Sequence, residues 1–156
     1  MLALPACFHP VPHVLLAFVA MHLLFGVTLS LVFQLAHTVE LNAFPVPEPH
    51  TGRMAHAWAV HEVETTANVA PTHRWACWYL GGLHFQIEHH LFPAIYHIHY
   101  PAMSTIVRQT CHDFALPYVC YPTIQAALVG HYRWLQTLGR GGDPRATTAA
   151  GQPQRG

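Results

Sequence analysis

The sequence predicts an all-α protein that is integral to a membrane, with one clear membrane-spanning helix and a helical region after it. Three observations support this fold class. Apolar residues make up 52% of the 156 residues and charged residues only 9%, with no lysine, whereas soluble domains carry about a quarter charged residues. The first 39 residues contain no Asp, Glu, Lys or Arg. Most of the later segments show helical spacing of their apolar residues.

The membrane-spanning helix is predicted over residues 13–37. Residues 14–36 are almost wholly apolar, and about 24 residues at ~1.5 Å each give ~36 Å, enough to cross a ~30 Å hydrocarbon core. A cleaved signal peptide is the alternative, but its basic start and its small-residue cleavage site are missing. Several prolines precede the span, so residues 1–12 are expected to be the end of an earlier span and a turn.

Residues 38–138 are expected to form a cytoplasmic helical cap. Arginines outside the tail all follow the span, and the positive-inside rule then places this region in the cytoplasm. Within the cap, helices are predicted at 54–70, 102–114 and 123–138, with a proline-rich loop at 41–52. Residues 75–91, with a break at Gly81-Gly82, are predicted to be a helix or a re-entrant segment lying against the membrane. Residues 139–156 hold half of the ten glycines and are predicted to be a disordered tail.

Composition excludes some functions and favours others. The net charge is zero and the arginines are scattered, so nothing indicates a nucleic-acid partner. Four cysteines form no C-x-x-C pair, which gives no support to a zinc finger or a disulfide framework. Fifteen histidines remain, and histidine is the commonest metal ligand. A nitrogen-rich ligand set without thiolates favours iron.

The strongest motif is the run Gln86-Ile87-Glu88-His89-His90. Adjacent histidines on a helix point ~100° apart, which suits two neighbouring metals better than one. Gln86 lies three and four residues before them on the same face, so its amide could ligate or hydrogen-bond the cluster. The alternative is a solvated histidine pair on a surface helix, but the apolar surroundings would make unpaired polar groups costly.

The second candidate is His37, at the end of the predicted span. Gln34 and His37 form a polar pair where the helix reaches the interface, which is a suitable place to meet a cytoplasmic metal site. A snorkelling interfacial histidine is the alternative. His22 lies fifteen residues earlier, about 22 Å along the helix axis, so it is expected to pack inside the helix bundle, apart from the site.

Three strings carry a resemblance to a known family: FQLAHTVE, WAVHEVETTANVA and WYLGGLHFQIEHHLFPAIYHIHYPAMS. From about residue 10 to 138 the sequence resembles the C-terminal half of the membrane fatty acid desaturases, in the front-end and linoleoyl-CoA-type branch whose third histidine box reads Q-x-x-H-H. The resemblance implies part of a four-span fold in a bacterial inner membrane or an ER-type membrane. It also implies a di-iron centre that uses O₂, and electrons from a ferredoxin or a cytochrome-type haem protein. A cis double bond would be formed in a fatty acyl chain, supplied as acyl-CoA or as membrane lipid.

The resemblance also implies site residues. Gln86, His89 and His90 match the third histidine box and His37 matches the extra histidine at the end of the last span, so these four are the expected metal ligands. No further catalytic residue is implied. Five further residues are placed less directly. Glu40 and Glu62 could orient ligating imidazoles through their carboxylates. His61 is a weaker candidate, and His97 and His99 are expected to be structural or supporting.

The first and second histidine boxes of the family are absent from the sequence. Only His9 and His13 lie before the apolar run 14–36, in the proline-rich turn. The chain is therefore expected to be the C-terminal part of a longer enzyme, with an incomplete iron site and no activity alone. Three alternatives stay open: a related membrane di-iron hydroxylase or ketolase, a bis-histidine haem protein, and a membrane fragment without catalysis.

Overall fold

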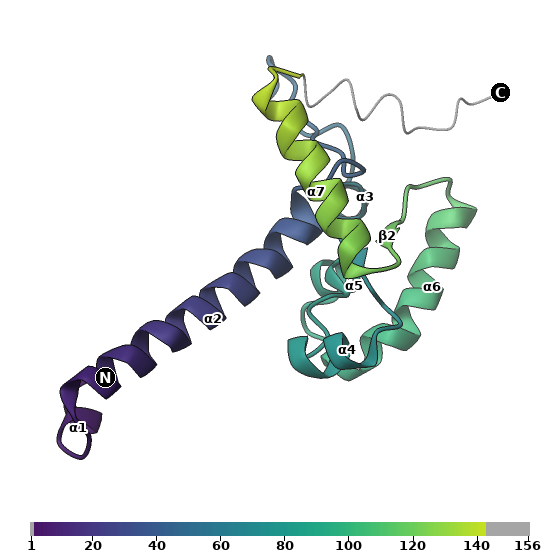
Figure 1. Cartoon of the computed structure of the whole chain (residues 1–156). Helices are drawn as coiled ribbons and strands as arrows, with labels where there is room; N and C mark the ends of the chain where they lie inside the picture. The colour runs from purple at the N-terminus through teal and green to yellow at the C-terminus, as the bar shows by residue number, and fades with distance from the viewer. Residues whose placement is uncertain (1, 143–156) are drawn as a thin grey trace. The chain divides into compact units, whose positions relative to one another are not determined.

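The structure is a computed structural model and describes residues 2–142. The described chain is mostly helical and contains seven α-helices, one 3₁₀ turn and two short strands. In chain order these are α1 (Ala3–Ala6), α2 (Val11–His37), α3 (Trp58–Thr65), β1 (Ala67–Val69), α4 (Arg74–Leu80), α5 (Gln86–Leu91), η1 (His97–His99), α6 (Tyr100–Asp113), β2 (Val119–Tyr121) and α7 (Ile124–Gly139) (Figure 1). They fall into two compact units, the first ending at Phe33 and the second beginning at Gln34.

The first unit holds the start of α2, a helix of 27 residues. Within residues 2–142, α2 alone is long and apolar enough to cross a membrane, and at ~1.5 Å per residue it measures about 40 Å. The predicted span is confirmed as a helix, although it begins at Val11 instead of residue 13. Pro12 does not delay the start, because a proline in the first turn removes no intrahelical hydrogen bond.

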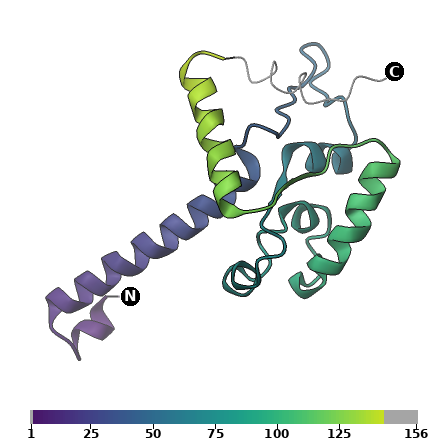
Figure 2. The same cartoon turned by 45° about the vertical axis from the view of Figure 1, so that its right-hand side comes forward.

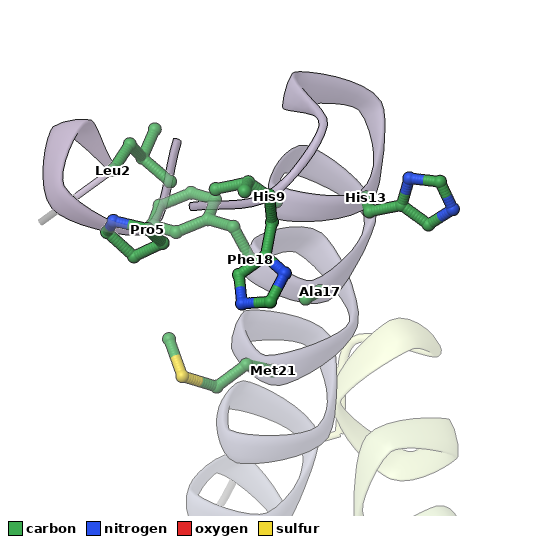
Figure 3. Close-up of a pocket in the computed structure, with 8 residues that line it drawn as sticks. Leu2, Pro5, His9, His13, Ala17, Phe18 and Met21 are labelled. Atoms are coloured by element: carbon green, nitrogen blue, oxygen red, sulfur yellow. The ribbon is translucent and has the colours of Figure 1, made fainter. Parts of the chain in front are cut away.

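A cavity of about 440 Å³ lies between α1 and the first turns of α2. Its lining is mainly apolar, with Leu2, Phe18 and Met21 grouped on one side together with the ring of His9, while the ring of His13 points away from them (Figure 3). None of the predicted metal ligands lines this cavity.

The second unit contains a two-stranded parallel sheet, which corrects the all-α prediction. Ala67 pairs with Val119, Asn68 with Cys120 and Val69 with Tyr121, so segments 52 residues apart in the chain lie side by side. Figure 2 shows the second unit from another side. The predicted helix over 54–70 is accordingly too long, since α3 ends at Thr65 and the chain turns extended at Thr66. The β-branched residues of this stretch lose side-chain freedom in a helix and favour a strand.

In the second unit α5 packs against β1 and α7 against β2. The helices α6 and α7 lie on different sides of this unit (Figures 1 and 2). Both begin and end within two residues of their predicted bounds. The predicted segment 75–91 is divided into α4 and α5 at Gly81 and Gly82, both of which have positive φ. A Cβ on Gly82 would lie 3.0 Å from Cβ of His97, so a residue without a side chain lets η1 approach this turn.

Two clusters of buried residues form the core of the second unit. One joins the end of α2 to the sheet and α7, and the other joins α3, α5 and α6: the first contains Leu35, Val39, Ala67, Val69, Ala70, Tyr121 and Ala127, and the second Val63, Ile87, Val107 and Cys111. His131 of α7 donates a hydrogen bond from Nδ1 to the carbonyl of Thr38 at 2.6 Å. These contacts fix the last turn of α2 within the unit.

The predicted disordered tail begins at residue 139. Gly139 is the last residue of α7, and the backbone N–H of Gly142 donates back to the carbonyl of Thr137 at 2.9 Å. Residues 143–156 lie outside the described part of the chain, so for them the tail stays a prediction.

Candidate functional site

The histidine motif lies on α5, a helix of only six residues. At ~100° per residue, Gln86, His89 and His90 fall within about 100° of one another, while Glu88 points to the opposite side. An isolated helix of this length is not stable in water. The orientation of the motif therefore depends on what holds α5 in place.

His90 makes the central contact of the site. Its Nε2 lies 3.2 Å from Nε2 of His37, and the two rings meet edge to face at 5.0 Å. Its Nδ1 lies 3.2 Å from a carboxylate oxygen of Glu62. Burial, followed by the neighbouring His37, lowers the pKa of His90, although Glu62 acts in the opposite direction. In a neutral ring whose Nδ1–H donates to Glu62, Nε2 keeps its lone pair toward His37.

His89 is held in a similar way. Its Nδ1 lies 3.3 Å from the hydroxyl of Tyr100, a buried residue at the start of α6. Its ring centre lies 5.7 Å from that of His90. In both α5 histidines the Nδ1 is therefore engaged by the protein, which leaves Nε2 for another ligand, as is usual for metal-bound histidine.

The His37–His90 pair has a geometry that a metal ion would accept. Bonds from imidazole nitrogen to a transition metal are about 2.1 Å long, so two nitrogens in one tetrahedral or octahedral shell lie about 3.0–3.4 Å apart. The observed 3.2 Å falls in that range. Within residues 2–142, however, no three or more His, Cys, Asp or Glu side chains form a group that could hold a metal ion. The geometry of the His37–His90 pair therefore fits a metal ion, but the described residues do not supply a complete set of ligands.

Gln86 supplies a second observation that fits a metal. Its side chain is almost fully buried, and its Nε2 donates to the carbonyl of Leu83 at 2.6 Å. Its Oε1 is buried and has no hydrogen-bond partner among the described residues. A buried carbonyl oxygen without a donor is costly, and an amide oxygen is a hard ligand suited to iron. The alternative of a solvated surface position does not hold for Gln86.

The other predicted residues have different outcomes. Glu62 lies against His90 as expected, but Glu40 pairs with Arg133 of α7 at 3.4 Å and not with a candidate ligand, so that prediction is wrong. Gln34 of the polar pair bonds to the hydroxyl of Thr38. His97 stacks on Tyr96. His22 belongs to the first unit, where its Nδ1 lies 2.8 Å from the carbonyl of Phe18.

A buried polar network behind α5 was not predicted. Glu88, with no exposed surface, accepts hydrogen bonds from Nδ2 of Asn68 at 2.7 Å and from the hydroxyl of Tyr118 at 2.8 Å. Burial raises the pKa of Glu88 and also that of Tyr118. Asn68 could have been noticed from sequence, because asparagine is depleted in strands and here stands between alanine and valine. Tyr118 lies thirty residues from Glu88, and no local signal marks it.

His84 was also missed. It is only 3% exposed, and neither ring nitrogen has a hydrogen-bond partner among the described residues. Burial, assisted by the nearby His73, lowers the pKa of His84 to about 4. The ring is therefore neutral at ordinary pH.

The described residues thus contain one helix long and apolar enough to cross a membrane, and the last residue of this helix faces a second histidine in a candidate metal site. The sequence profile described as fatty acid desaturase matches residues 1–122. The chain belongs to the fatty acid desaturase family.

Curated relatives agree with this assignment. The chain is similar to an sn-1 linoleoyl-lipid 6-desaturase of Synechocystis sp., at 38% identity over 83% of this chain and 36% of the relative. It is also similar to an acyl-lipid (8-3)-desaturase of Physcomitrium patens, at 44% identity over 78% of this chain and 25% of the relative. The chain thus spans about a quarter to a third of the length of these relatives. No solved structure matches it.

Proposed function

We propose that this chain forms part of an O₂-dependent desaturase that introduces a cis double bond into a fatty acyl chain. Membership of the family supports this reaction, and the relatives named as linoleoyl-lipid and acyl-lipid desaturases favour an acyl chain carried on a membrane lipid, ahead of acyl-CoA. The electron donor would be a ferredoxin or a cytochrome-type haem protein, as in the family that the sequence resembles.

In this proposal His37, Gln86, His89 and His90 are iron ligands. When bound, the di-iron centre supplies the activation of O₂ needed to break an unactivated C–H bond. Glu62 would hold His90 in the tautomer whose Nε2 lone pair is free, and Tyr100 would fix the ring of His89.

The placement in the membrane is part of the same proposal. Residues 13–37 would form the last span of a four-span fold, with residues 1–12 as the end of the preceding one. Residues 38–138 would form the cytoplasmic cap, in a bacterial inner membrane or an ER-type membrane. The arginines at 53, 74, 108 and 133 follow the span and support this orientation.

One observation carries the proposed metal site: Nε2 of His90 and Nε2 of His37 face each other at 3.2 Å while Nδ1 of His90 contacts Glu62. The test is Co²⁺ binding to the whole chain in detergent, followed by visible absorption. We expect a cobalt–imidazole spectrum that His37→Ala or His90→Ala abolishes. His112→Ala removes an exposed histidine and should leave the spectrum unchanged. Equal spectra in all three variants would refute the site.

A further inference from the structure

Behind α5, the side chains of Asn68, Glu88 and Tyr118 each contact the other two. Asn68 donates from Nδ2 to Glu88 and accepts, on Oδ1, the backbone N–H of Ile87 at 3.0 Å. Tyr118 donates to the other oxygen of Glu88. Its hydroxyl also lies 2.7 Å from Nδ2 of Asn68. The side-chain oxygens of Asn68 and Glu88 are thus all occupied.

These contacts act on a different side of α5 from the candidate ligands, and on the opposite side from Gln86 and His90. Glu88 lies about 160° around the helix from both Gln86 and His90. Asn68 belongs to β1 and Tyr118 immediately precedes β2, so the network joins the back of α5 to both strands of the sheet. Because Asn68 holds a side chain and a backbone N–H of neighbouring residues, α5 can neither turn about its axis nor slide without breaking at least one bond.

Even a small rotation of α5 would displace the candidate ligands. A side-chain tip lies about 5–6 Å from a helix axis, so a rotation of about 20° moves it about 2 Å. Metal sites require their ligands to be placed within about 0.5 Å. The apolar contacts of Ile87 bury this helix, but apolar contacts are not directional. Directional bonds are needed to fix its rotation.

We propose that Asn68, Glu88 and Tyr118 form a clamp that sets the rotation of α5, and that Asn68 is a positioning residue for His89 and His90. The inference rests on the proposed function, since it concerns the direction in which the proposed ligands point. None of the three clamp residues is itself a ligand.

An exchange of the amide and the carboxylate between positions 68 and 88 tests this proposal. Asn68→Asp places a second carboxylate against Glu88. Glu88→Gln leaves one acceptor oxygen for the two groups, Nδ2 of Asn68 and the hydroxyl of Tyr118, that donate to Glu88. The double variant Asn68→Asp with Glu88→Gln restores one amide facing one carboxylate, while residue 68 still offers an oxygen to the N–H of Ile87. Tyr118→Phe removes only the hydroxyl, and its matched control is Tyr121→Phe, which removes a buried hydroxyl that has no partner among the described residues.

The first measurement needs no metal. In the whole chain in detergent, hydrogen exchange of the Ile87 amide and the ¹⁵N chemical shifts of the His90 ring report the orientation of α5. We expect faster exchange and a mixture of His90 tautomers in Asn68→Asp, Glu88→Gln and Tyr118→Phe. The double variant and Tyr121→Phe should resemble the unchanged protein. Unchanged exchange and ring shifts in both Asn68→Asp and Glu88→Gln, with helix content intact, would overturn the clamp.

The second measurement is Co²⁺ affinity. Residues that support metal ligands typically contribute about 10- to 100-fold to affinity, so each single variant should bind at least about tenfold more weakly, with recovery in the double variant. If the ring shifts respond as expected but Co²⁺ does not bind even to the unchanged protein, the clamp stands and the proposed metal site fails. If Co²⁺ binds equally well in all variants, Asn68 has no positioning role.

Discussion

At the level of single residues, Gln86 differs from the three candidate histidines because it is almost fully buried, and its Oε1 has no partner among the described residues. Gln86→Leu keeps the bulk and removes this oxygen. The loss of the bond to Leu83 and the removal of the unpartnered oxygen have opposite effects, so stability should change by less than about 1 kcal/mol. Metal affinity should fall, as measured by Co²⁺ titration beside thermal unfolding. Undiminished affinity in Gln86→Leu, with His89→Ala inactive in the same titration, would exclude a ligand role.

His84 gives a prediction about pH. Its folded pKa of about 4 lies below the ordinary 6.5, so between these values the unfolded chain binds a proton that the folded chain does not. Stability should therefore be lost as pH falls from about 6.5 to about 4, by on the order of 3 kcal/mol. Denaturant unfolding of the metal-free chain at pH 7 and pH 5 measures the first part of this loss, about 2 kcal/mol.

The control for His84 is a pair of variants. His84→Leu removes the titrating ring and should make stability less dependent on pH, whereas His112→Ala, at an exposed position, should keep the full dependence. An acid loss of the same size in His84→Leu would assign it to other groups.

At the level of elements, the packing of α7 against β2 depends on Gly130. A Cβ at this position would lie 2.6 Å from the hydroxyl oxygen of Tyr121 and 3.0 Å from its ring. Gly130→Ala should destabilise the second unit by about 1–3 kcal/mol, because neither the helix nor the buried ring can move freely. Thermal unfolding in detergent checks this.

Gly139 provides the matched control on the same helix. A Cβ there meets nothing within 4 Å, so Gly139→Ala should be neutral or slightly stabilising. Tyr121→Phe in the Gly130→Ala background removes the closest atom and should restore part of the loss. Similar melting of the two glycine variants would show that α7 does not pack as described.

The elements also show what sequence could and could not predict. Long apolar or amphipathic segments gave α2, α6 and α7 within two residues of their observed ends, because helical periodicity is a local property. The strands were missed since each has three residues, too few for an alternating pattern, and their pairing is a long-range contact. The motif on α5 could be found from sequence because its residues are neighbours in the chain. Tyr100 and Tyr118, whose hydroxyls contact His89 and Glu88, could not, because no local signal marks these contacts.

At the level of the whole molecule, the described residues bring two imidazoles face to face, and Gln86 of the same motif has a buried amide oxygen without a partner among them. No group of three or more His, Cys, Asp or Glu that could hold a metal ion occurs in this part of the chain. Two iron ions require more donors than these. We expect that residues 1–156, expressed in membranes with an electron donor, form no new unsaturated fatty acid; fatty acid profiling measures this. Appearance of a new unsaturated product would refute it.

A fusion complements that experiment. An upstream half of a family member that carries H-x-x-x-H and H-x-x-H-H boxes, joined before residue 10, should yield iron-dependent desaturation. His90→Ala in the fusion should abolish the product, while His112→Ala should retain it. Failure of the fusion to bind iron, although it inserts into membranes, would argue against the proposed ligands.

The parallel pairing of β1 with β2 also has a consequence for the order in which the protein is made. The candidate ligands all emerge from the ribosome by residue 90, but β2 and Tyr118 follow about thirty residues later. At synthesis rates of about 5–20 residues per second, α5 waits for roughly 1.5–6 seconds before its partners exist. During that interval the histidines are present without their final orientation. A chain stopped at residue 110 would carry every candidate ligand and still lack the strand that sets them, so metal loading should follow the completion of β2.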